Sequence, residues 1–181
     1  EILKFWEENN IFDKSITTRD DNKPFVFFEG PPSANGMPGI HHVMGRTIKD
    51  IMNRYKAMQG FDLRYQNGFD CQGLWVEVEV EKELGFKSKK DVEEYGIEKF
   101  VNLCKDRVRK YSAIQTEQSE RLGYWMDWDN SYFTMSDENN YTIWSMLKKL
   151  FEDGKIYRGT DVVPWSGKSG TSYSQMEIIE G

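Results

Sequence analysis

The stretch of sequence that decides the fold is residues 29–46, which read EGPPSANGMPGIHHVMGR. It follows a short apolar run, PFVFF at residues 24–28, which is typical of a strand buried on both faces of a parallel sheet. The glycines and prolines of the stretch predict a loop, and a helix is predicted to follow from about residue 41 to residue 59. Gly60 comes directly after that helix, in the position where a glycine commonly ends one.

The predicted helix leads into a second strand, at residues 61–66, and then into a turn at Asn67-Gly68. Strand, glycine-rich loop, helix and strand in this order begin a doubly wound nucleotide-binding fold. The predicted fold class is therefore α/β: the first half of a Rossmann-like domain, with a parallel sheet and flanking helices, plus a helical segment. The helix should be amphipathic, because apolar residues line one side of it: Met44, Ile48, Ile51, Tyr55 and Met58.

Residues 75–135 are predicted to form a mostly helical excursion from that domain. A long helix is expected over residues 97–122. The run VEVEVEKEL at residues 76–84 alternates as a strand would, but a helix is also compatible with it. The remaining predictions are a helix at residues 2–9, a solvated loop at 87–90, a helix cap at Asp91, a helix at 138–152 capped by Asp137, and a strand at 162–165.

The composition is that of a folded domain with an ordinary charged surface. Aromatic residues make up 14% of the 181 residues, and so much bulky apolar surface requires burial, which excludes a disordered chain. The net charge of -6 does not suggest the basic face of a free-standing nucleic-acid binder. No apolar run approaches the length of a membrane span, so no membrane partner is expected. Cys71 and Cys104 form no CxxC pair, which fits free thiols in a cytoplasmic protein.

The loop and the helix start within residues 29–46 have the chemistry of an anion site. Backbone N–H groups at a helix N-terminus bind anions, and glycines let a phosphate approach closely. Both histidines of the chain, His41 and His42, lie at that helix start, where imidazole N–H groups could donate to a polyphosphate. The positive end of the helix dipole disfavours imidazolium, so both are expected to be neutral. From these features alone, a nucleotide loop and an ordinary strand-to-helix connection are about equally favoured.

As a motif, residues 29–46 closely resemble the signature loop of the class I aminoacyl-tRNA synthetases, which usually reads Gly-Pro-Pro-x-Ala-Asn-Gly and ends in His-x-Gly-His. Within the class, the sequence Ala-Asn-Gly is similar to that of the isoleucyl enzymes. Further segments resemble the family in the same order and extend the match over nearly the whole chain: residues 67–74 (NGFDCQGL), 77–90, 121–127 (RLGYWMD) and 162–165 (VVPW).

The resemblance implies an ATP-dependent activation of isoleucine to isoleucyl-adenylate, followed by transfer to tRNA(Ile). ATP with Mg²⁺ would be a substrate. Among the chain's residues, His42 would contact the ATP phosphates as the main catalytic imidazole, with His41 as a helper. The nucleotide loop would be lined by Asn35, Gly36 and Gly39.

The amino-acid side of the implied site consists of a carboxylate and a pocket floor. Asp70 matches the family carboxylate that pairs with the α-ammonium group of the substrate, and a charge-assisted pair of this kind is strong. On residue type alone, Asp70 would more often be a turn-capping residue. Gly30 and Pro31 match the floor of the amino-acid pocket, where the proline ring offers apolar contact to a branched side chain.

The chain departs from the family pattern at three places. Gly39 stands where the family has its first motif histidine, and His41 stands where it has glycine, so that only His42 keeps its register. Gln72 replaces a family histidine. Many relatives carry Cys-x-x-Cys and bind structural zinc at residues 166–169, where this chain has SGKS. Neutral serine is a poor zinc ligand, so no structural zinc is expected.

The resemblance places residues 1–181 as the N-terminal half of a catalytic domain, cut off before the editing insertion. The lysine-rich Lys-Met-Ser-Lys-Ser motif of the family is missing from these residues, so the isolated segment is expected to be inactive or very weak. One alternative is a paralogue or fragment that binds a nucleotide or a partner without catalysis. A second is another nucleotidyltransferase of the same superfamily, which would not explain the match between residues 68 and 127.

Overall fold

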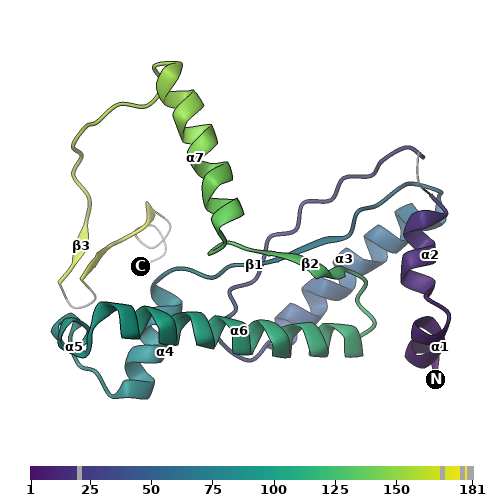
Figure 1. Cartoon of the computed structure of the whole chain (residues 1–181), viewed down its shortest axis with the longest axis horizontal. Helices are drawn as coiled ribbons and strands as arrows, with labels where there is room; N and C mark the ends of the chain where they lie inside the picture. The colour runs from purple at the N-terminus through teal and green to yellow at the C-terminus, as the bar shows by residue number, and fades with distance from the viewer. Residues whose placement is uncertain (20–21, 168–169, 176–177, 179–181) are drawn as a thin grey trace.

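The computed structural model describes residues 1–19, 22–167, 170–175 and 178. Figure 1 shows a mixed α/β arrangement in which the long helix α6 runs along one side and α3 lies beside a set of extended segments. The helices are α1 (Ile2–Glu8), α2 (Ile11–Thr17), α3 (Ile40–Met58), α4 (Leu74–Leu84), α5 (Lys89–Tyr95), α6 (Ile97–Arg121) and α7 (Asp137–Glu152). The strands are β1 (Gln66–Phe69), β2 (Asp127–Phe133), β3 (Trp165–Ser166) and β4 (Thr171–Ser172).

The parallel pair of β1 and β2 confirms the predicted sheet type, but it is formed by other residues than expected. Gly68 pairs with Tyr132 and Phe69 with Phe133. The predicted turn at Asn67-Gly68 is therefore wrong, because these residues lie inside β1. The physical reason is long-range: a side chain at residue 68 would overlap the ring of Tyr132, so glycine here permits a close strand pairing.

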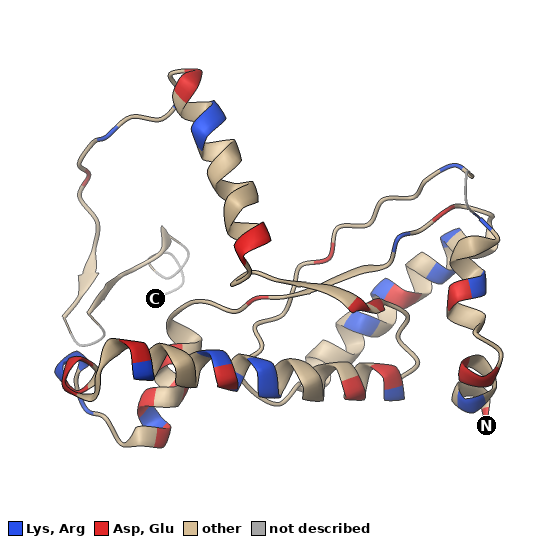
Figure 2. Cartoon of the chain, viewed as in Figure 1, with Lys and Arg blue, Asp and Glu red and all other residues tan. Residues whose placement is uncertain are grey.

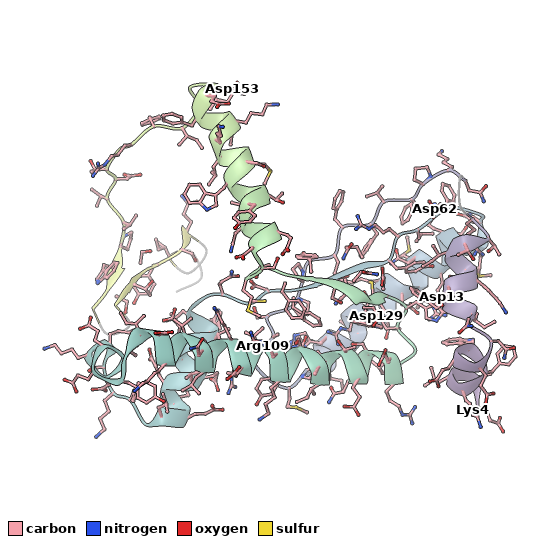
Figure 3. The ribbon with its side chains drawn as sticks, in the orientation of Figure 1. Lys4, Asp13, Asp62, Arg109, Asp129 and Asp153 are labelled. Carbon is pink, nitrogen blue, oxygen red and sulfur yellow. The ribbon has the colours of Figure 1, made fainter. Side chains whose placement is uncertain are left out.

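The two predicted strands at residues 24–28 and 61–66 are instead extended segments without a continuous ladder. The longer stretches 24–33 and 62–70 run parallel and are joined by isolated bridges at their two ends, Pro24 with Asp62 and Ser33 with Asp70. Figure 3 labels Asp62 at the end near α2. Between the bridges the segments separate around a cavity of about 380 Å³. Burial on both faces is also wrong for residues 24–28, because Phe28 is 89% exposed.

Helix α3 confirms the predicted helix within one residue at each end, and Gly60 follows its C-cap with a φ of +87°. The predicted apolar side, however, is exposed: Met58, for example, is 83% accessible. The buried face carries Arg46, Asn53 and Ala57. Arg46 can face inward here because α6 supplies partners: Arg46 Nη1 donates to Ser119 Oγ at 2.5 Å.

The helical excursion resolves the ambiguity at residues 76–84. Helix α4 forms there, because Val76 and Val80 are one helical turn apart and are each only 2% exposed. Helix α5 begins earlier than predicted, at Lys89, with Ser88 as its N-cap residue. Asp91 accepts hydrogen bonds from the backbone N–H groups of Lys87 and Ser88, so it completes the cap from inside the helix rather than starting it.

Two clusters of buried apolar residues hold these elements together. One joins the loop after residue 33 to β1, α4 and α6, through Ala34, Phe69, Cys71, Val76 and Val108. The other joins α3 to the extended segment before β1 and the turn before β2, through Ala57, Leu63, Tyr65, Tyr124 and Met126. The loop at residues 33–36 is therefore anchored to the sheet and to α6, which positions the site described below.

Helix α7 extends away from these clusters, and Asp153 at its tip is labelled in Figure 3. Figure 2 shows that the middle of α7 carries no charged residues. Ser136, not Asp137, caps this helix, with its hydroxyl accepting from Asn139 N–H at 3.2 Å. The predicted strand at 162–165 is displaced to the short hairpin β3–β4. Among the described residues, no helix is long and apolar enough to cross a membrane.

The packing of Tyr132 on Gly68 gives a stability prediction. Gly68→Ala should lower the free energy of unfolding by about 1–3 kcal/mol, because the added methyl group forces the ring away. The matched control is Gly45→Ala on α3, where an added methyl group meets open space and should stabilise by up to about 1 kcal/mol. Urea denaturation of both variants measures the difference. Equal midpoints for the two would contradict the close pairing.

Candidate active site

The first feature of the site is the contact between the loop after residue 31 and the end of β1. Asp70 N–H donates to Pro32 O, and Ala34 N–H donates to Asp70 O, each at 3.1 Å. The Ser33 hydroxyl also donates to Asp70 Oδ2 at 3.0 Å. The glycine-rich loop and the carboxylate that the sequence singled out are thus brought together, and one carboxylate oxygen of Asp70 is engaged within the chain.

His42 is held by the residue that begins α3. Its Nδ1 atom accepts a hydrogen bond from Gly39 N–H at 2.9 Å. An Nδ1 that accepts is unprotonated, so the neutral ring carries its proton on Nε2 and can donate that proton to a ligand. Burial, followed by the neighbouring charges of His41 and Arg46, lowers the pKa of His42. This is the direction expected for a histidine at a helix N-terminus, although burial is the leading cause.

His41 occupies the space that a side chain at residue 39 would need. The two imidazole rings are 3.9 Å apart between centroids and are tilted by 40°. A β-carbon added to Gly39 would lie 2.7 Å from His41 Cε1 and 2.9 Å from His41 Nδ1. In this structure the imidazole of His41 therefore lies over Gly39, in the space that a side chain at residue 39 would enter.

The loop is also tied to α6, through two residues that the sequence did not single out. Arg107 Nε donates to the backbone oxygen of Asn35 at 2.8 Å, and Gln115 Nε2 donates to Ser33 O at 3.3 Å. The side chain of Arg107 is 9% exposed and pairs with Glu79 and Glu83 of α4. A basic residue on a helix face is common, so only its distant partners reveal its part in positioning the loop.

The sequence also did not single out two residues near Asp70, one on β2 and one directly after that strand. The ring of Tyr132 packs on Gly68, and burial, followed by the negative charges of Glu29 and Asp70, raises the pKa of Tyr132. Thr134 orders the turn after Asp70: its hydroxyl accepts from Cys71 N–H, and its carbonyl accepts from the Gln72 amide, each at 2.8 Å. Gln72 thus has a structural partner in Thr134.

Other predicted site residues are open toward solvent. Added β-carbons at Gly30 and Gly36 would meet no atom within 4 Å, so a ligand has access to the backbone at both positions. Pro31 is half-buried between them. Across the described ranges, no three His, Cys, Asp or Glu side chains are grouped so that they could hold a metal ion. Ser166 is buried, while Lys168 and Ser169 lie outside the described residues, so the prediction about zinc stays a prediction.

Comparison with known proteins identifies the family. The family described as tRNA synthetases class I (I, L, M and V) matches residues 1–181, and the chain belongs to this family. The chain is 47% identical to the isoleucine–tRNA ligase of Dehalococcoides mccartyi (strain CBDB1), over the whole chain and 18% of that relative. It is 43% identical to isoleucine–tRNA ligase 2 of Bacillus anthracis, over 99% of the chain and 17% of that relative. The chain thus spans less than a fifth of the length of these relatives.

A solved structure agrees with the fold. The LeuRS of Agrobacterium radiobacter K84, in a ternary complex with tRNA and LeuAMS, superposes with a TM-score of 0.72 at 22% identity. The alignment covers 99% of this chain and 20% of that one. The similarity confirms the predicted Rossmann-like α/β class.

The environment of His42 predicts a pH dependence. In an NMR titration its pKa should lie below 6.5, the ordinary value, because burial disfavours the imidazolium. The unfolded chain then binds this proton more tightly, so the contribution of His42 to stability is fully present above pH 6.5 and is lost as the pH falls through the folded-state pKa. The control His41→Gln should raise the pKa of His42 only in part, because burial is the larger cause. A pKa of 6.5 or above would contradict the assignment.

Proposed function

We propose that this chain forms part of the adenylate-forming site of an isoleucine–tRNA ligase. The substrates are isoleucine, ATP with Mg²⁺, and tRNA(Ile), and the place of action is the cytoplasm. Residues 1–181 are the N-terminal half of the catalytic domain, and residues 75–135 are its helical excursion. The family membership and the 47% identity to an isoleucine–tRNA ligase support this proposal.

The observation that carries the proposal is the joining of an anion-binding helix start to a carboxylate. Helix α3 begins with two imidazoles, while Asp70 is fixed to the same loop by the bonds to residues 32–34. A carboxylate at one end of the loop suits an ammonium group, and the helix start at the other end suits phosphates. An amino acid and ATP are the substrate pair that needs both.

In the proposed reaction, a carboxylate oxygen of isoleucine attacks the α-phosphorus of ATP, and the bond from that phosphorus to the bridging oxygen of pyrophosphate breaks. His42 donates from Nε2 to the phosphates, where negative charge builds up. His41, folded over Gly39, is its helper. The nucleotide lies along Asn35, Gly36 and Gly39, and the open space at Gly36 leaves room for close approach.

At the other end of the site, Asp70 binds the α-ammonium group of isoleucine through the carboxylate oxygen that Ser33 does not use. Gly30 and Pro31 form the floor under the branched side chain. Each contact fixes the isoleucine carboxylate for in-line attack, and such positioning is a large part of catalysis without a covalent intermediate. The segment binds no structural zinc, because serine stands at residues 166 and 169.

Isoleucine-dependent ATP–pyrophosphate exchange by the complete protein tests the function, with Asp70→Ala as the informative variant. Loss of the charged partner should weaken isoleucine binding by about 2–5 kcal/mol and change the KM for ATP much less. Ser33→Ala is the matched control: it removes only the hydroxyl bonded to Asp70 and should retain most of the affinity. An unchanged KM for isoleucine in Asp70→Ala would refute the role of Asp70, and exchange that ignores isoleucine would refute the function.

A second prediction ranks the two imidazoles. His42→Ala should lower kcat for adenylate formation by about 100- to 1000-fold, as loss of one preorganised donor typically does. His41→Ala should fall short of that range, and His41→Gly should be milder still unless His41 supplies the task of the missing motif histidine. Single-turnover adenylate formation compares the three variants. An equal or larger loss at His41 would mean that the catalytic imidazole has moved to residue 41.

A further inference from the structure

A buried polar cluster joins the start of the loop to α3 and to the segment after α6. Its centre is Glu29, which directly precedes Gly30 and Pro31 and whose side chain is only 6% exposed. A carboxylate this deeply buried must be paired, because an unpaired charge away from water is strongly unfavourable. The partners of the Glu29 carboxylate show which parts of the chain it connects.

Both oxygens of the Glu29 carboxylate are engaged by other elements. The ammonium group of Lys49, on α3, donates a hydrogen bond to Oε1. The hydroxyl of Tyr124, which follows α6, donates to Oε2 at 3.2 Å. Burial, followed by the negative charge of Glu29, raises the pKa of Tyr124 far above its usual range, so its hydroxyl keeps the proton that it donates. Glu29 thus joins the start of the loop to α3 and to the segment that follows α6.

The other end of the same short segment is held in a similar way. Arg46 of α3 donates to the Gln115 side-chain oxygen at 3.3 Å, and the Gln115 amide donates to Ser33 O at 3.3 Å. Residues 29 and 33 are therefore each connected to α3, the helix that presents His41 and His42. The segment between them carries Gly30 and Pro31, the proposed floor of the amino-acid pocket.

We propose that Glu29, through Lys49 and Tyr124, is a positioning residue that fixes the amino-acid side of the site relative to the phosphate side. It touches neither substrate; it sets the distance between residues 30–33 and the start of α3. The inference rests on the proposed function for its kinetic consequence. Its structural consequence, a loop held by the Glu29 carboxylate, stands independently of the reaction.

Glu29→Gln is the variant of choice in the complete protein, because it keeps the shape and removes the charge. Misplacement of reacting groups by about 1 Å costs about 100-fold in rate, so kcat for isoleucine-dependent adenylate formation should fall by about 10- to 100-fold. The KM values for isoleucine and ATP should stay within about twofold, because neither substrate loses a contact. Lys49→Arg should keep most of the rate, and Lys49→Met should lose it as Glu29→Gln does.

Two further variants keep the test decisive. Tyr124→Phe removes a single hydroxyl and should give a smaller loss of kcat in the same direction, so it serves if Glu29→Gln fails to fold. Glu8→Gln is the matched control, since it breaks an exposed ion pair with Lys4 and should change nothing. A kcat within twofold of the parent in both Glu29→Gln and Tyr124→Phe, or a loss confined to KM, would overturn the positioning role.

Hydrogen exchange of the backbone amides separates this inference from the proposed function. In Glu29→Gln, or in Tyr124→Phe if the former does not fold, the backbone amides of Gly30 and of residues 33–36 should exchange faster than in the parent, while those of residues 100–115 in α6 should not change. Unchanged exchange at Gly30 and residues 33–36 would overturn the inference, whatever the activity. Faster exchange in a protein that performs no isoleucine-dependent reaction would support the positioning of the loop and refute the proposed function instead.

Discussion

The two backbone hydrogen bonds of Asp70, to Pro32 O and from Ala34 N–H, are the constraint on which the site depends. They fix a loop without regular structure to the end of a strand, and they place a carboxylate beside that loop. The course of the chain after this loop then places the remaining site residues. The loop continues into α3, so the helix start and the carboxylate share one short connection. Buried backbone groups must find partners, and here the partners also bring functional groups together.

A second constraint is the unusual inward face of α3. Its apolar side is exposed, whereas Arg46 and Asn53 point inward, and Arg46 is satisfied by residues of α6. Polar contacts of this kind contribute little net stability, but they are directional, and removing one partner is costly. Such contacts therefore suit α3, because they fix its rotation about its own axis and its position along α6. At the start of the helix, the imidazole of His41 lies over Gly39, where a side chain would meet it.

Local patterns predicted much of this arrangement. The helix near residues 41–59 and the long helix at 97–122 follow from apolar spacing and a glycine stop, whereas the place of Asp70 in the site is implied only by the family resemblance of residues 67–74. The strands were misplaced because pairing is long-range: the fit of Tyr132 on Gly68 has no local signal. For the same reason Arg107, whose partners lie in other elements, was not found.

The most direct test of the account is a crystal structure of the complete protein with a non-hydrolysable analogue of isoleucyl-adenylate. The account predicts that the ammonium group of the analogue lies about 3 Å from a carboxylate oxygen of Asp70. It also predicts that the phosphate mimic is within hydrogen-bond distance of His42 Nε2, at the start of α3. An analogue bound with its ammonium group away from Asp70, or with its phosphate mimic away from the start of α3, would contradict it.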